Sequence, residues 1–145
     1  MAQITSIVGE NLEGGQIFVA VDSAANDSDK TITVPARKVW QILAVHVTNA
    51  TSADVGNRQL VCIVSDGTNT LGTYNAVAVQ AQSTTEYYNW AAQYNTATET
   101  PAGFFCTPMP ASLLPDGGTI RIYDSAAIAA TADDLTVVVY GISLR

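Results

Sequence analysis

The chain has 145 residues, of which 13% are charged, and its formal net charge is −7. This length suits a single domain with one sizeable hydrophobic core. The six Lys and Arg residues are scattered and form no basic stripe for a phosphate backbone, which argues against a nucleic-acid partner. No stretch approaches the roughly 20 apolar residues that span a bilayer, and "MAQITSIVGE" lacks the basic and apolar regions of a signal peptide. We therefore expect no membrane association and a protein that stays in the cytoplasm where it is made.

The first segment, residues 1–14, is predicted to be a short extended arm ahead of one domain that covers residues 15–145. Its stretch "AQITSIV" is apolar and rich in residues that favour strands. An unpaired segment of this kind can add a strand to an exposed sheet edge of another protein. Ile4, Ile7 and Val8 are the candidate contact residues of the arm.

The rest of the chain alternates apolar with polar or small residues in short runs that are separated by Gly, Asn, Asp and Pro. The predicted strands are 15–21, 30–34, 37–50, 58–65, 70–79, 85–92, 119–124 and 135–144. Eight short strands of this kind predict an all-β fold, a jelly-roll-like β-sandwich in a single domain.

The strand 37–50 is apolar on both alternating faces, so it is predicted to be central and covered on both sides over much of its length. It carries His46, the one histidine of the chain. We interpret His46 as a structural residue rather than a general base, because no G-x-S-x-G motif occurs and nothing places a serine beside it. The sequence thus offers no catalytic residues, and we expect no enzyme activity.

The strand 58–65 begins with an unexpected charge. By period-two counting, Arg58 falls in the same row as Leu60, Cys62 and Val64, which otherwise looks like core. Cys62 and Cys106 both lie among apolar residues, which favours buried free thiols over a disulfide.

Turn residues agree with the strands on either side of them. Asp-Gly in "SDGTN" (65–69) and Pro-Asp-Gly in "LPDGG" (114–118) are favoured reversal sequences.

Two segments fit the pattern of short strands and tight turns less well. Residues 93–118 hold four of the five prolines and are long for a loop, which indicates an interaction surface, and residues 125–134 fit either a short helix or an Ala-rich loop.

The sequence gives only weak signals for a ligand-binding site. Asp22, Asp27 and Asp29 cluster in one segment, but the glycine and distal glutamate of a calcium loop are absent, so a solvated acidic turn is favoured. No phosphate-binding motif occurs, and we expect no cofactor. The aromatic cluster 86–94 suits either recognition or core packing, and Tyr88 with Trp90 is predicted to belong to the core.

One succession of features covers about Thr31 to Ile142. It runs from Val-Pro-Ala before a long strand, through Gly-Asn-Arg and Leu-Pro-Asp-Gly-Gly, to a Val-rich strand that ends in Tyr-Gly. In this order the features resemble the head decoration, or cement, proteins of tailed bacteriophages. The resemblance implies a structural, non-enzymatic β-sandwich that forms a homotrimer. It also implies a place on the capsid exterior of the virion, against the major capsid protein, after assembly in the host cytoplasm.

Under this resemblance, Ile4, Ile7 and Val8 become candidate capsid contacts. Arg58 has two interpretations that stay open: its guanidinium pairs across a subunit boundary, or it forms an intrachain ion pair at the rim of the sandwich. The alternative function is a receptor- or carbohydrate-binding head of a phage fibre or tail protein. A fibre head normally follows a stalk of repeats or heptads, and none precedes residue 15, which favours the cement protein.

Overall fold

The structure is a computed structural model that describes residues 3–5, 15–24, 28–92, 97–98, 103–128 and 131–144. These residues form strands and turns, with no helix among them and hence none long and apolar enough to cross a membrane. All eight predicted strands are present, as β2 (Gln16–Asp22), β3 (Asp29–Thr33), β4 (Val39–Ala50), β5 (Leu60–Ser65), β6 (Thr70–Asn75), β7 (Thr85–Ala91), β11 (Thr119–Asp124) and β12 (Asp134–Leu144). Four shorter strands are added, β1 (Gln3–Thr5), β8 (Ala97–Thr98), β9 (Phe104–Pro108) and β10 (Ser112–Leu114).

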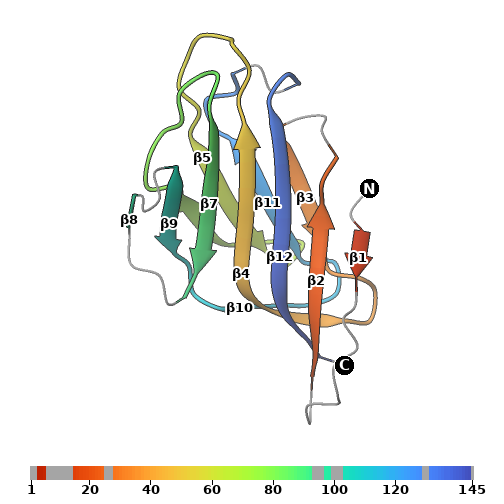
Figure 1. Cartoon of the computed structure of the whole chain (residues 1–145). Coiled ribbons are helices and arrows are strands. Elements are labelled where there is room, and N and C mark those ends of the chain that lie inside the picture. Colours follow the sequence, from red (N-terminus) through yellow and green to blue (C-terminus); the bar gives the residue numbers. More distant parts are fainter. Residues whose placement is uncertain are drawn as a thin grey trace.

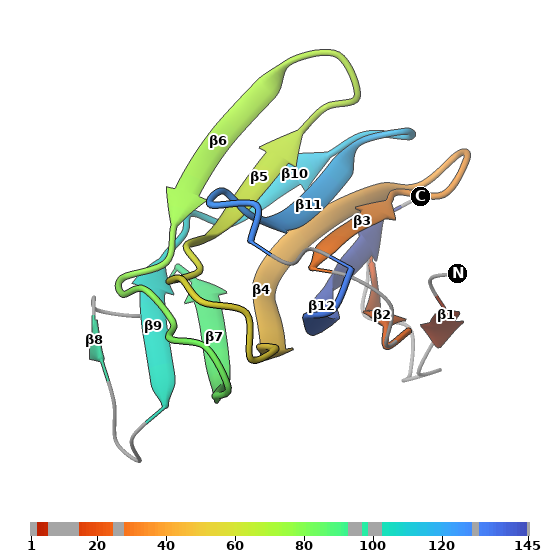
Figure 2. The same cartoon turned by 90° about the horizontal axis from the view of Figure 1, so that it is seen from above.

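The strands form two sheets that pack face to face (Figure 2). The large sheet has the order β1-β2-β12-β4-β7-β9-β8, with β10 also paired to β4, and the small sheet has the order β3-β11-β5-β6. Counted among the eight predicted strands alone, these orders are 1-8-3-6 and 2-7-4-5. This is the connectivity of a jelly roll, so the predicted fold class is confirmed. Figure 1 looks onto the large sheet, with the small sheet behind it.

The core lies between the two sheets and is filled by the inward row of each strand. Its members include Phe18, Ala20, Ile32, Trp40, Ile42, Val45, Val47, Cys62, Val64, Tyr88, Trp90, Ile120, Ile122, Leu135, Val137 and Val139. Tyr88 and Trp90 are 1% and 0% exposed, and their rings stack with centroids 5.8 Å apart. The prediction that this pair belongs to the core is therefore confirmed.

A β-bulge in β4 changes which side chains of this strand face the core. Pairing with β12 passes from Ala44 opposite Tyr140 to Ile42 opposite Gly141, which leaves Leu43 as the extra residue. The alternation of buried residues therefore shifts by one position at the bulge. Even-numbered residues such as Ile42 face the core before it, and odd-numbered residues such as Val45 face the core after it. β4 is central, as predicted, but among the described residues only its inward face is covered by a second sheet. Both of its alternating rows are apolar because one buried face changes phase along the strand.

The irregular segments also differ from the prediction. Within the described part of 93–118, β9 pairs parallel to β7 and β10 pairs antiparallel to β4, so this segment contributes to the large sheet and is more than a loop. The described residues of 125–133 form turns and irregular backbone, which fits the loop interpretation, and Asp134 begins β12. The "SDGTN" reversal joins β5 to β6 as predicted, with Gly67 at a φ of 99° and the carboxylate of Asp66 accepting from the amide of Thr68 at 2.8 Å.

The N-terminal arm is partly incorporated in the large sheet. β1 pairs antiparallel with β2, and Gln3 lies opposite Val21. The arm is therefore not an unpaired segment over Gln3–Thr5, because those residues already pair with an edge of their own sheet. Ile4 lies on β1, whereas Ile7 and Val8 fall outside the described residues.

Candidate functional site

The side chain of Arg58 is completely buried and paired within the chain. Its Nε and Nη2 donate to the two carboxylate oxygens of Asp133 at 2.7 and 3.0 Å, and both side chains are 0% exposed. Nη1 donates to the carbonyl oxygens of Asp54 and Gly56 at 2.8 and 2.7 Å, and Nη2 also donates to the hydroxyl of Ser52 at 3.0 Å. The five N–H groups of the guanidinium thus all have acceptors in the same chain.

This arrangement decides between the two interpretations of Arg58. The intrachain ion pair is present, and no donor of Arg58 remains for a residue across a subunit boundary. Burial by itself would raise the pKa of Asp133, but the hydrogen bonds from Arg58 and Ser52 outweigh it and hold that pKa below its ordinary value. Arg58 therefore fastens the loops at one end of the sandwich, and its role is structural.

His46 points outward from the large sheet. Its Nδ1 forms a hydrogen bond with Oδ1 of Asn89, its neighbour on β7. An amide partner orients the imidazole but supplies neither a nucleophile nor a carboxylate, so the described contacts of His46 make no catalytic pair.

Two carboxylates of the acidic segment, Asp22 at the end of β2 and Asp29 at the start of β3, form ion pairs, and the side chain of Asp29 stays exposed to water. Asp22 lies 3.9 Å from the ammonium of Lys30, which donates to a backbone carbonyl oxygen at 2.7 Å. Asp29 accepts from Nε of Arg121 at 2.9 Å, while Asp27 is outside the described residues. Within the described part of the chain, no three candidate ligands come together as a metal site.

Both cysteines are free, as predicted. Cys62 is buried in the core, and burial raises the pKa of its thiol to about 12, which makes it unreactive at neutral pH. Cys106 is only half-buried. It lies beside Asn89 in the register of β7 and β9, and so it shares the outward row with His46.

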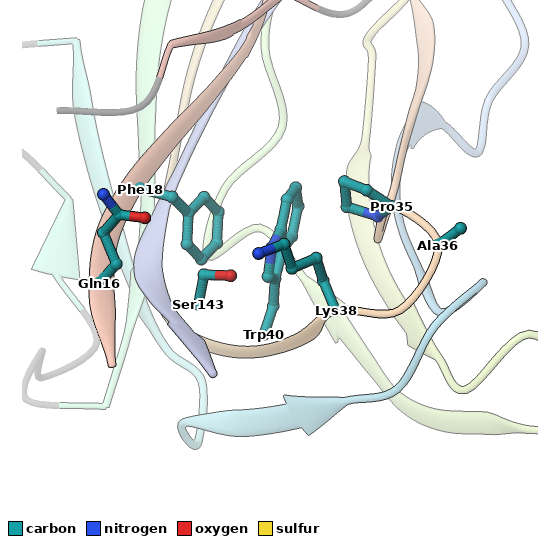
Figure 3. Close-up of a pocket in the computed structure, with 7 residues that line it drawn as sticks. All are labelled: Gln16, Phe18, Pro35, Ala36, Lys38, Trp40 and Ser143. Carbon is teal, nitrogen blue, oxygen red and sulfur yellow. The ribbon is translucent and has the colours of Figure 1, made fainter. Parts of the chain in front are cut away.

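A pocket of about 240 Å³ opens where the ends of β2, β4 and β12 meet the turn before β4 (Figure 3). Its lining residues are Gln16, Phe18, Pro35, Ala36, Lys38, Trp40 and Ser143. The stacked rings of Phe18 and Trp40, with centroids 4.0 Å apart, form its wall. Figure 3 shows the polar ends of Lys38 and Ser143 in front of these rings. The sequence alone could not indicate this pocket, because its lining comes from three strands and a turn.

The outer face of the large sheet, which faces the viewer in Figure 1, is broad. The strand register and the alternation of buried residues show which described side chains point outward from this sheet. They include Ile17, Val19, Val21, Gln41, His46, Thr48, Tyr87, Asn89, Phe104, Cys106, Leu113, Thr136, Val138, Tyr140 and Ile142. Asp134, at the start of β12, is the one charged residue in the outward rows of the described strands. Leu113, Tyr87 and Tyr140 are 59%, 40% and 37% exposed.

The outer face of the small sheet has a different character. Thr31, Thr33 and Thr73 are exposed on it. Arg121 pairs with Asp29 and lies 4.5 Å from the ring centroid of Tyr123. This face mixes exposed polar side chains and a matched ion pair with apolar groups, among them Ile63 and Leu71, of which Leu71 is 50% exposed.

Comparisons with known proteins assign no family. The sequence matches no family and no curated protein. Among solved structures, PfGH50B and an exo-beta-agarase are 16% and 15% identical with TM-scores of 0.40 and 0.41, and the chain spans 22% of each. A family 11 carbohydrate-binding module from Clostridium thermocellum, in complex with a beta-1,3-1,4-mixed-linked tetrasaccharide, is 14% identical with a TM-score of 0.31, over 99% of this chain and 82% of that one. Similarity this low identifies neither a relative nor a ligand.

Proposed function

We propose that this protein is a capsid decoration, or cement, protein of a tailed bacteriophage. It acts without catalysis, as a homotrimer that binds the outside of the shell of major capsid protein and stabilises it. The observation that carries this proposal is the difference between the two outer faces, since the large sheet offers a broad neutral surface suited to protein contact. The order of sequence features between Thr31 and Ile142 supports the same function by resemblance.

The stabilisation follows from binding to the assembled shell. A protein that binds the intact shell and not its separated subunits raises the free energy needed for disassembly. Each copy needs only modest affinity, because many simultaneous contacts on a closed shell act together as avidity. The outer face of the small sheet, with its exposed threonines and its paired Arg121 and Asp29, is the surface that suits exposure to water in such an assembly.

The test compares capsids that carry the full-length protein with capsids that carry none. We expect the full-length protein to raise the temperature at which DNA is released. Equal release temperatures at full occupancy contradict a reinforcing role.

A third preparation tests the arm. Deletion of residues 2–9 removes β1 and the candidate capsid contacts Ile4, Ile7 and Val8. We expect lower occupancy of the deleted protein on the shell. Unchanged occupancy would reject the arm as a contact and leave the reinforcing role standing.

The second candidate function is a carbohydrate- or receptor-binding head, and the pocket of Phe18 and Trp40 favours it. Aromatic side chains with a few polar groups beside them are typical of small-ligand pockets. Under this function, purified protein binds oligosaccharides, and Lys38→Met with Gln16→Ala weakens binding while the two buried rings stay in place. Imaging of intact particles separates the candidates, because a cement protein lies on the capsid and a fibre head lies at the tail.

A further inference from the structure

We infer that the outer face of the large sheet is the surface through which copies of this chain contact one another. This inference rests on the proposed function only for the expectation that the protein works as an oligomer. It assigns the contact to particular residues, above all Tyr140 and Val138 of β12, Tyr87 of β7, Phe104 of β9 and Leu113 of β10.

The first argument is the concentration of exposed apolar groups. Six large hydrophobic side chains are exposed among the described residues. Tyr87, Leu113 and Tyr140 lie together on this face, whereas Val55, Leu71 and Val79 are scattered over other parts of the chain. The ring of Tyr87 stacks on that of Phe104 with centroids 4.7 Å apart, which holds both rings in place before any partner arrives. Aromatic side chains that lose little entropy on binding and a lack of charge are typical of the centre of an interface.

The second argument concerns the charge of the partner. The chain carries a net charge of −7, so two copies repel each other wherever their carboxylates meet. Two copies that meet through this face bring few carboxylates together. Among the described residues in the outward rows of its strands, only Asp134 at the start of β12 carries a charge. A strongly charged partner would find no complementary charge here, and its own charges would be buried without partners. A second copy presents the same neutral surface and avoids that cost.

The third argument is size. β2 and β7 have seven residues each, and β12 and β4 are longer. Four neighbouring strands at least about 24 Å long and the five-residue β9 of about 17 Å, all about 4.8 Å apart, give a flat footprint of roughly 540 Å², before the relief of the side chains is counted. This approaches the roughly 800 Å² per partner of a standard stable interface. The face is therefore large enough to hold copies together with little additional contact.

The experiment places a lysine on this face and on the opposite one. Tyr140→Lys and Tyr87→Lys put a charge into the proposed contact at exposed positions, where folding tolerates it. Thr31→Lys and Thr73→Lys make the same change in charge at exposed positions of the small sheet. Because lysine reduces the net negative charge, lost association in the first pair cannot result from stronger overall repulsion.

The measurement is the mass in solution over a range of concentrations, with circular dichroism to confirm folding. We expect an assembled wild type, a dissociation constant raised by about 30-fold or more in each tyrosine variant, and little change in the threonine variants. A dimer in which the face meets its own copy supports both the inference and the charge argument, whereas a trimer supports the inference alone, because there the face meets another side of the next subunit.

Cys106 provides a second readout without further mutation, because it lies in the outward row of β9. We expect a maleimide reagent to modify it slowly in the assembled protein and faster after dilution or in Tyr140→Lys. Cys62, which is buried in the core, serves as the internal control and should remain unmodified while the protein is folded.

Two results would overturn the inference: a wild type that is monomeric at every concentration, or tyrosine variants that assemble as the wild type does. If the wild type is monomeric and Tyr140→Lys lowers occupancy on capsids, the face binds the shell instead, which rejects both the inference and the homotrimer but supports binding to the capsid. If the copies assemble through the face but do not raise the DNA-release temperature, the inference stands and the proposed function fails.

Discussion

The buried guanidinium of Arg58 is tolerated in this sandwich because its whole set of donors is satisfied. Removing a charge from water costs several kcal/mol, and only close pairing with further hydrogen bonds offsets that cost. Asp133 supplies two acceptors, and three more come from the loop before β5. The pair therefore ties that loop to the segment before β12.

Asp133→Asn leaves the charge of Arg58 buried without its counterion. We expect a loss of about 3–5 kcal/mol in the free energy of unfolding, measured by denaturant titration. Asp29→Asn is the matched control, because it breaks an arginine pair whose two side chains are 45% and 46% exposed. That change should cost no more than about 1 kcal/mol. Equal losses in the two variants contradict the assigned role of Arg58.

The ion pair of Arg58 and Asp133 also predicts how the free energy of unfolding changes at acidic pH. The pKa of Asp133 is lowered in the folded protein, so its contribution to stability is present above the unfolded value of about 3.9 and is lost as pH falls through the folded value. Wild type loses this contribution in acid, whereas Asp133→Asn has none to lose. We expect the difference in unfolding free energy between them to be constant near neutral pH and to shrink below about pH 4. A difference that stays the same down to pH 2 would show that Asp133 does not titrate as described.

Among the elements, β4 and β12 form the longest contact of the large sheet, and the bulge lies in their middle. At the bulge Gly141 of β12 lies against the backbone of Gln41. A Cβ on Gly141 would meet the carbonyl oxygen of Gln41 and lie 2.9 Å from a ring carbon of Phe18. The absence of a side chain at Gly141 is thus what lets the two strands stay paired across the change of phase.

Gly141→Ala is expected to lower the free energy of unfolding by about 1–3 kcal/mol, because the clash is with backbone and a packed ring. Gly72→Ala in β6 is the control. A Cβ there meets the outer end of the Tyr74 ring, a partly buried side chain and not backbone, so a smaller loss is expected. Denaturant titration of both variants is the measurement. A larger loss in Gly72→Ala would contradict this account of the bulge.

At the scale of the whole molecule, the chain carries a large net negative charge while the outer face of the large sheet carries almost none. This difference predicts the effect of salt on self-association. Repulsion between copies of net charge −7 acts over a Debye length that shrinks from about 30 Å at 0.01 M to about 8 Å at 0.15 M salt. Because the proposed contact face is nearly neutral, salt should weaken the repulsion and leave the contact intact. We expect tighter association at the higher salt, measured by sedimentation. Weaker association there would indicate a contact made by charges.

The fold class and its eight main strands followed from the sequence alone, because alternation of apolar residues reports directly on a half-buried strand and Asp-Gly pairs report on reversals. The inward placement of Tyr88 and Trp90 followed for the same reason. The short strands β9 and β10 did not, since their proline-flanked sequences form strands only through partners elsewhere in the sheet.

Tertiary structure alone decided four further properties. The phase change in β4 depends on how β12 pairs with it, and the partner of Arg58 lies 75 residues away along the chain. The pocket and the neutral outer face likewise combine side chains from separate strands. Alternation shows that a strand has two faces, but it does not show which strands lie side by side. A surface made by several strands therefore exists only once the sheet has formed.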